Sequence, residues 1–185
     1  MNMPKTIIRD LSLLIHSPVE YLYSFTYSDQ EKVTIEPFSQ QVRDTGNKLV
    51  RKIKKNLPDL TVHFVGSPVF GIPGQRDVDL YVECLPKTFG QNLPVMISLF
   101  GTPQKTREKF YEWHFIENDC AIEILFGDPS LPIFTETLKV CRIIGSKREY
   151  INEYAKIKME SNGVSLREYK RRRLLFFNRL LKNQN

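Results

Sequence analysis

Residues 65–83 of the chain read VGSPVFGIPGQRDVDLYVE, and the end of this stretch has the alternating pattern of a β-strand. Asp77 and Asp79 alternate with aliphatic residues, so the two carboxylates share one face of the strand while the aliphatic side chains share the other. Neighbouring carboxylates repel each other unless a positive charge lies between them. Mg²⁺ prefers oxygen ligands and is usually held by one or two carboxylates together with substrate phosphates. The pattern therefore predicts a metal site, with an exposed strand face as the alternative.

A Gly-Ser turn precedes this strand, since nine residues separate Gly66 and Ser67 from Asp77. Glycine allows a sharp turn and a close approach of the backbone to a phosphate. The Ser67 hydroxyl and the backbone N–H groups after it would then bind phosphate oxygens, unless Ser67 only caps the next segment. Arg76, beside the carboxylates, would either pair with them or hold a phosphate. A phosphate cradle next to a metal-binding strand is typical of a nucleoside triphosphate site.

A second predicted strand, Ala121–Phe126, carries a third carboxylate. Glu123 lies on the polar face of this strand, opposite the face that holds Ile122 and Ile124. If the two strands are neighbours in one sheet, three carboxylates converge. Such a group is needed to hold two metal ions about 3.5–4 Å apart for in-line phosphoryl transfer. A cross-strand pair between Glu123 and a lysine or arginine is the alternative.

These features resemble the DNA polymerase beta type nucleotidyltransferases and, within them, the GrpB family, over roughly residues 33–182. The stretches that carry the resemblance are His63–Gly74 (HFVGSPVFGIPG), Phe134–Leu138 (FTETL), Glu153–Lys158 (EYAKIK), and Tyr169 with Arg173, where the family tends to have tyrosine and lysine. The chain departs from the family in two ways. Many members lack one or more of the three carboxylates that are present here. In addition, Pro68 stands where a small residue is usual, and proline has no backbone N–H for a phosphate.

The resemblance implies a metal-dependent nucleotidyltransferase that transfers a nucleotide from a nucleoside triphosphate such as ATP to an acceptor hydroxyl. It makes Asp77, Asp79 and Glu123 the catalytic residues and the ligands of Mg²⁺ or Mn²⁺. The nucleotide-binding residues would be Gly66, Ser67, Arg76, Lys158, Tyr169 and Arg173. Lys158 and Arg173 each follow a tyrosine by four residues on a predicted helix, so helix packing is the alternative for them. The sequence does not indicate the nucleobase, or whether the acceptor is a small molecule, RNA or protein.

The order of the predicted elements is typical of an α+β fold, a nucleotidyltransferase-like mixed β-sheet flanked by helices with a helical C-terminal half. We expect an N-terminal helix and extension in residues 1–32 and one domain in residues 33–185. That domain would have its sheet core at about 33–127 and its C-terminal helices at about 133–182. Strands are predicted at 33–36, 61–65, 78–84, 109–117 and 121–126, and helices at 4–16, 37–57, 93–100, 133–144, 147–159 and 166–181.

Single residues mark several of these boundaries. Pro37 is expected to open the helix at 37–57, and Gly46 to weaken the middle of it. Asn118-Asp119 is expected to form a tight turn between two strands. Ser146 is expected to cap the helix that follows it.

The net charge of +6 and the pI of about 9.2 favour a polyanionic partner such as a nucleotide or RNA. Basic residues cluster at 48–55 and 170–173, where solvated helix faces are the alternative. No run of 18 apolar residues occurs, so we expect no membrane association, and without a signal-like N-terminus the cytoplasm is the expected location. The three cysteines are far apart, and the spacing of His63 and His114 is not that of metal ligands, so neither a disulfide framework nor a zinc site is predicted. Both histidines are expected to pack or to form hydrogen bonds.

Two other functions remain open on the sequence. One is a non-catalytic module on the same fold that binds a nucleotide or a coenzyme-like ligand, because GrpB domains are fused to a coenzyme A biosynthetic kinase in some chains. The other is an RNA- or tRNA-directed binding or toxin-type protein whose basic helices dock the RNA. A steep salt dependence of RNA affinity would support the latter. The oligomeric state is not indicated.

Overall fold

The computed structural model describes residues 26–182 of the 185-residue chain. These residues belong to two compact units. The sheet unit contains residues 36–141, and the helical unit contains residues 26–35 together with residues 142–182. The helix predicted at 4–16 lies outside the described residues.

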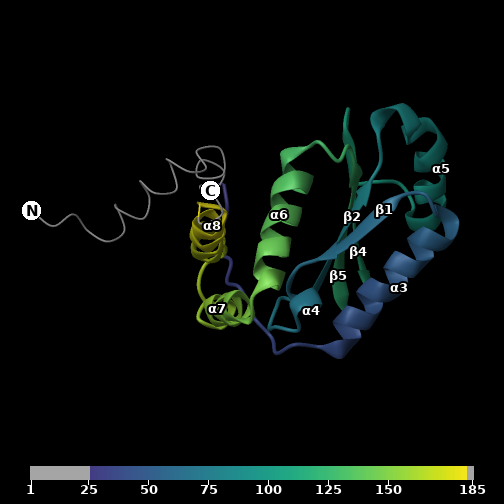
Figure 1. The fold of residues 1–185 in the computed structure, drawn as a ribbon. Coiled ribbons are helices and arrows are strands. Elements are labelled where there is room, and N and C mark those ends of the chain that lie inside the picture. Colours follow the sequence, from purple (N-terminus) through teal and green to yellow (C-terminus); the bar gives the residue numbers. More distant parts are fainter. Residues whose placement is uncertain (1–25, 183–185) are drawn as a thin grey trace, which may run out of the picture. The chain divides into compact units, whose positions relative to one another are not determined.

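A mixed sheet of five strands forms the sheet unit, in the order β1-β2-β5-β4-β3. Figure 1 labels β1, β2, β4 and β5. The strands are β1 (Thr61–Val65), β2 (Asp77–Glu83), β3 (Lys105–Arg107), β4 (Phe110–Glu117) and β5 (Cys120–Gly127). Strands β2 and β5 are parallel, and the other neighbouring pairs are antiparallel. The predicted α+β class is confirmed, and four strands lie within one residue of their predicted bounds. The sequence does not predict β3, because its three residues are polar and all exposed.

Two helices, α3 (Gln40–Asn56) and α5 (Phe89–Phe100), pack on the apolar face of the sheet (Figure 1). Leu49 and Ile53 of α3 and Met96 of α5 are fully buried there against aliphatic and aromatic side chains of the strands. Burial of these side chains is the main source of stability for this face, because each removes apolar surface from water.

The boundaries of these two helices differ from their predicted positions. The backbone N–H and carbonyl of Glu36 both pair with Gly74, at 2.8 and 3.0 Å, and a residue before proline favours extended backbone. Pro37 therefore does not open α3, which begins at Gln40. Helix α5 begins four residues earlier than predicted and contains Pro94, which removes only one backbone N–H from the helix.

The turn predicted at Asn118-Asp119 joins β4 to β5. Both residues have positive φ angles, 51° and 56°, as a two-residue type I′ hairpin turn requires. Asparagine and aspartate tolerate this left-handed backbone better than other non-glycine residues. The turn therefore sets the register of the hairpin, in which Glu117 lies opposite Cys120 and His114 lies opposite Glu123.

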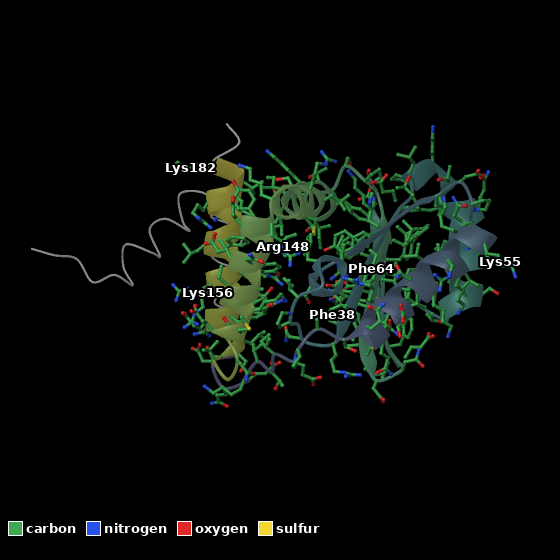
Figure 2. All side chains as sticks on the ribbon, turned by 60° about the horizontal axis from the view of Figure 1, so that its bottom comes forward. Phe38, Lys55, Phe64, Arg148, Lys156 and Lys182 are labelled. Carbon is green, nitrogen blue, oxygen red and sulfur yellow. The ribbon has the colours of Figure 1, made fainter. Side chains whose placement is uncertain are left out.

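Gly46 was expected to weaken the middle of α3, but in the structure it is the place where the helix contacts Phe64. A Cβ atom at Gly46 would lie 2.3 Å from Cζ of Phe64, far inside van der Waals contact. Phe64 is labelled in Figure 2 among the side chains that fill the space between the sheet and α3. The absence of a side chain at Gly46 thus lets the ring of Phe64 reach the helix backbone.

We expect Gly46→Ala to destabilise the protein by about 1–3 kcal/mol, the usual range for overpacking, although alanine has the higher helix propensity. Gly90→Ala is the matched control, because Gly90 lies in α5 with nothing within 4 Å of its Cβ position. That change should stabilise by up to about 1 kcal/mol. Urea unfolding measures both free energies. Equal stabilisation by the two alanines would contradict the close contact between Gly46 and Phe64.

The other face of the sheet is partly covered by the first turns of α6 (Pro132–Ser146). Phe134 is fully buried and packs on Tyr81, with ring centroids 5.3 Å apart. Val65 and Leu125 complete this second apolar cluster. The apolar cluster shares its face with the acidic side chains at the start of β2.

The helical unit consists of residues 26–35, the end of α6, α7 (Arg148–Met159) and α8 (Leu166–Lys182). The strand predicted at 33–36 is wrong, since only isolated bridges form, between Lys32 and Ser165 and, within the sheet unit, between Glu36 and Gly74. Ser146 is not the predicted cap. Its hydroxyl donates to the Ile143 carbonyl at 2.7 Å, because α6 continues to this residue.

No helix in the part of the chain that the structure describes has the length and apolar character needed to cross a membrane.

Candidate metal and nucleotide site

The carboxylates predicted as metal ligands lie on neighbouring strands. The parallel register of β2 and β5 places Asp79 opposite Glu123, and side chains opposite each other point to the same face. Asp77 shares that face two residues earlier on β2, and all three residues are partly exposed. Among the described residues, however, the three ligand groups found within 4.8 Å of one another include Glu123 but neither aspartate. Binding of ions by the predicted triad therefore requires the aspartates to turn toward Glu123.

The Gly-Ser turn lies directly beside these carboxylates, since Val65 at the end of β1 is opposite Asp79. Gly66 has a φ of 89°, a backbone conformation that favours glycine. A Cβ atom there would lie 3.1 Å from Oδ2 of Asp79. Glycine thus allows the backbone at the turn to pass close to a carboxylate of the site.

Ser67 is 2% exposed and lies in the short helix α4 (Ser67–Phe70). A Cβ atom at Gly74 would be 2.1 Å from the Ser67 hydroxyl oxygen and 3.7 Å from Oδ1 of Asp77. The loop between β1 and β2 is therefore folded tightly on itself next to Asp77. Gly66, not Ser67, occupies the cap position of α4, so the predicted alternative of a Ser67 cap is not seen.

Arg76 has a φ of 58°, a left-handed backbone conformation that is uncommon for residues other than glycine. Its hydrogen bonds are to the Glu36 carboxylate at 3.5 Å, the Gln41 side chain at 3.3 Å and the Asp119 carbonyl at 3.4 Å. All three distances are at the long end for hydrogen bonds. In the part of the chain that the structure describes, Arg76 therefore pairs with Glu36 rather than with the two aspartates, and the alternative role of holding a phosphate stays a prediction.

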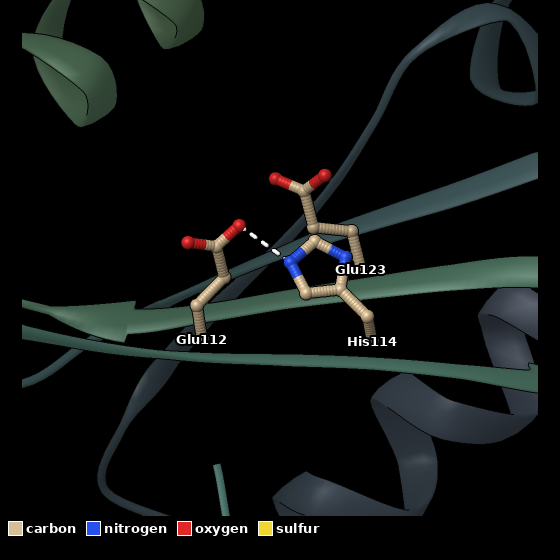
Figure 3. Close-up of side chains that lie close together, drawn as sticks. All are labelled: Glu112, His114 and Glu123. Atoms are coloured by element: carbon tan, nitrogen blue, oxygen red, sulfur yellow. Dashed lines mark hydrogen bonds and ion pairs between the residues drawn. The ribbon is translucent and has the colours of Figure 1, made fainter. Parts of the chain in front are cut away.

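Glu112 and His114 belong to the same face, and the sequence reading does not place them in the site. His114 lies opposite Glu123, and Glu112 precedes it by two residues on β4. Oε1 of Glu112 accepts a hydrogen bond from Nε2 of His114 at 2.6 Å (Figure 3). The same oxygen accepts a second hydrogen bond from Nζ of Lys105 at 3.0 Å. The hydrogen bond expected for His114 is present. The tight turn at 118–119, combined with strand alternation, was the sequence feature from which the pairing with Glu123 could be deduced.

The remaining predicted residues, Lys158, Tyr169 and Arg173, lie in the helical unit. Lys158 is 3% exposed, and its Nζ lies 2.9 Å from the Tyr169 hydroxyl. It also lies over the rings of Tyr154 and Tyr169, while the Arg173 guanidinium lies 5.8 Å from the Tyr169 ring centroid. These contacts hold α7 against α8, as the helix-packing alternative expects. Their role in nucleotide binding stays a prediction.

Two of the three cysteines, Cys84 and Cys120, are core residues, and Cys141 is partly exposed. Cys84 and Cys120 are buried in the sheet unit. Burial raises the pKa of the Cys120 thiol above its usual value, because the thiolate would lose its hydration. A neutral buried thiol is a poor nucleophile and a poor metal ligand, so Cys120 is not a candidate for the chemistry of this site.

Comparison with known proteins identifies the type of fold that this chain has. No family model matches the chain, and no curated protein sequence matches it. Among solved structures it is similar to the conserved protein GrpB from Enterococcus faecalis, with a TM-score of 0.62 and 10% sequence identity. The match covers 81% of this chain and 98% of that one. At this identity the similarity shows the fold, and the chain therefore has a GrpB-like fold.

Proposed function

We propose that the protein is a metal-dependent nucleotidyltransferase that moves a nucleotide from a nucleoside triphosphate to an acceptor hydroxyl. The main support is the parallel pairing of β2 with β5, which sets Asp79 beside Glu123 with Asp77 on the same face. Three carboxylates on one face fit Mg²⁺ or Mn²⁺, because these ions favour oxygen ligands. A Cβ atom at Gly66 would lie 3.1 Å from Oδ2 of Asp79, so the backbone of this turn passes close to the carboxylates. A phosphate bound there can contact that backbone.

Each carboxylate has a distinct role in the proposed reaction. Asp77 and Asp79 hold the metal ions, and Glu123 completes the site and accepts the proton of the attacking hydroxyl. Bound ions supply charge stabilisation for the phosphates. The acceptor oxygen bonds to the α-phosphorus while the bond from that phosphorus to its bridging oxygen breaks, and pyrophosphate leaves. Positioning and electrostatics account for most of such catalysis, so few further groups are needed.

In this proposal the turn between β1 and β2 binds the phosphates. The hydroxyl of Ser67 is packed against Gly74, so its contact with a phosphate requires the turn to open. Pro68 offers no N–H. The backbone N–H groups at Gly66 and Ser67 are the proposed donors, since these two residues follow directly on Val65, which lies opposite Asp79.

ATP should bind in a Mg²⁺-dependent manner, and Asp77→Asn should weaken the binding at least about tenfold, because Mg²⁺ relies on both carboxylates and phosphates for its ligands. Calorimetric titration of ATP with and without Mg²⁺ measures this. Mg²⁺ alone should bind weakly. Asp59→Asn is the control, since Asp59 is an exposed carboxylate just before Thr61, at the end of β1 that pairs with Glu83 rather than with Asp79. The proposed site would be contradicted if the affinity for ATP did not depend on Mg²⁺ and were unchanged in Asp77→Asn.

A further inference from the structure

A second group of metal-ligating side chains lies on the same sheet face. In the part of the chain that the structure describes, Glu112, His114 and Glu123 have ligand atoms within 4.8 Å of one another. Figure 3 shows the three side chains rising from the same side of β4 and β5. The group combines an imidazole with two carboxylates, which distinguishes it from the purely acidic set of Asp77, Asp79 and Glu123.

Glu112 gives this group a buried negative charge. Its side chain is 10% exposed, and a carboxylate at that depth is costly unless positive or donor groups compensate it. Compensation comes from two donors at a single oxygen, His114 at 2.6 Å and Lys105 at 3.0 Å. Lys105 is 55% exposed, so its ammonium can move into solvent when another cation takes its place beside Glu112. The position next to Glu112 is thus already one that favours a cation.

The geometry needs little change to hold a metal ion. Zinc lies about 2.0–2.2 Å from nitrogen and carboxylate ligands, so the ligand atoms of one ion are roughly 3–4 Å apart. Ligand atoms that lie up to 4.8 Å apart must therefore approach one another by about 1–2 Å at most. Such a change is within the range of side-chain rotations, and the His114 side chain is 43% exposed.

We propose that Glu112, His114 and Glu123 form a binding site for a first-row transition-metal ion, with Zn²⁺ bound far more tightly than Mg²⁺. Imidazole nitrogen suits zinc and neighbouring transition metals, whereas Mg²⁺ prefers ligands that are all oxygen. Three protein ligands leave a coordination position open to water or substrate, as in catalytic zinc sites. The site shares Glu123 with the proposed nucleotidyl transfer but does not depend on that reaction.

The test is titration of Zn²⁺ alone into the full chain without nucleotide. Calorimetry measures the affinity for zinc, and thermal unfolding measures the change in melting temperature. One equivalent should bind, with Mg²⁺ at least about a hundredfold weaker. His114→Gln and Glu123→Gln should each weaken zinc binding at least about tenfold and reduce the zinc-induced rise in melting temperature accordingly. Both side chains are partly exposed, so the variants should fold, which circular dichroism without metal verifies.

A matched control exists on the same sheet. Nε2 of His63 lies 2.7 Å from Oε1 of Glu83, and both side chains are 29% exposed, but this pair is not part of the three-residue group. His63→Gln should therefore leave zinc affinity unchanged within about threefold. A loss of zinc binding in His63→Gln equal to that in His114→Gln would overturn the proposed site.

The other outcomes separate this site from the proposed function. Zinc binding that survives His114→Gln but is lost in Asp79→Asn would place the ion at the aspartates, and this inference would fail while the nucleotidyltransferase proposal stands. A wild-type protein that binds no zinc also overturns the inference. The third outcome is zinc binding that is weakened in His114→Gln and Glu123→Gln but not in His63→Gln, in a protein whose ATP affinity does not depend on Mg²⁺. This outcome would support the zinc site and contradict the nucleotidyltransferase proposal.

Discussion

Glu123→Gln should slow nucleotide transfer at least about a hundredfold, which is roughly 2.7 kcal/mol of activation free energy. The affinity for ATP should change by less than about tenfold, or roughly 1.4 kcal/mol. Glu123 lies on β5, separate from the aspartates on β2, and its proposed contacts are with the attacking hydroxyl and the metal. An interaction that matters mainly in the transition state affects the rate more than it affects binding of the substrate.

The measurement is transfer of labelled nucleotide in a cell lysate that offers RNA, protein and metabolite acceptors. Glu83→Gln is the control, because Glu83 lies on β2 on the same face and pairs with His63 at 2.7 Å. That variant should keep its activity. If the wild type binds ATP but labels no acceptor, the non-catalytic binding module is the better description. If transfer occurs and Glu123→Gln equals the wild type, the role assigned to the third carboxylate is wrong.

Trp113→Ala should destabilise the protein by about 3–5 kcal/mol, the range found when large aromatic residues are removed from a core. Trp113 is fully buried on the side of β4 opposite Glu112 and His114. Its indole N–H donates to the Gly101 carbonyl at 2.8 Å, and its ring packs edge-on against Phe126. The substitution would therefore leave a cavity behind β4, the strand that carries Glu112 and His114, and would remove the hydrogen bond to Gly101.

Urea unfolding followed by circular dichroism measures this loss, since Trp113 is the only tryptophan and its fluorescence disappears in the variant. Ile116→Ala on the same strand is the control, because Ile116 is 72% exposed and should change stability by no more than about 0.5 kcal/mol. Trp113→Phe retains most of the volume and should cost less than the alanine variant. A loss below about 1 kcal/mol for Trp113→Ala would contradict its place in the core.

The sequence by itself determined four of the five strands and the faces of these strands. Alternation with a period of two predicted β1, β2, β4 and β5 within one residue and placed Asp77, Asp79 and Glu123 on polar faces. The Asn118-Asp119 turn was also predictable, because a two-residue hairpin needs residues that tolerate positive φ. These features could be predicted from the sequence because they depend on residues that are only a few positions apart along the chain.

Only the tertiary structure decided which faces meet. The pairing of β2 with β5, which joins residues more than 40 positions apart, depends on burial of the whole sheet rather than on local pattern. The same applies to Gly46, which a local propensity scale describes as a weak helix residue but which contacts Phe64. It also applies to Arg76, whose partners Glu36 and Asp119 come from distant loops. Packing and hydrogen bonds across the fold, which a linear pattern does not contain, brought these residues together.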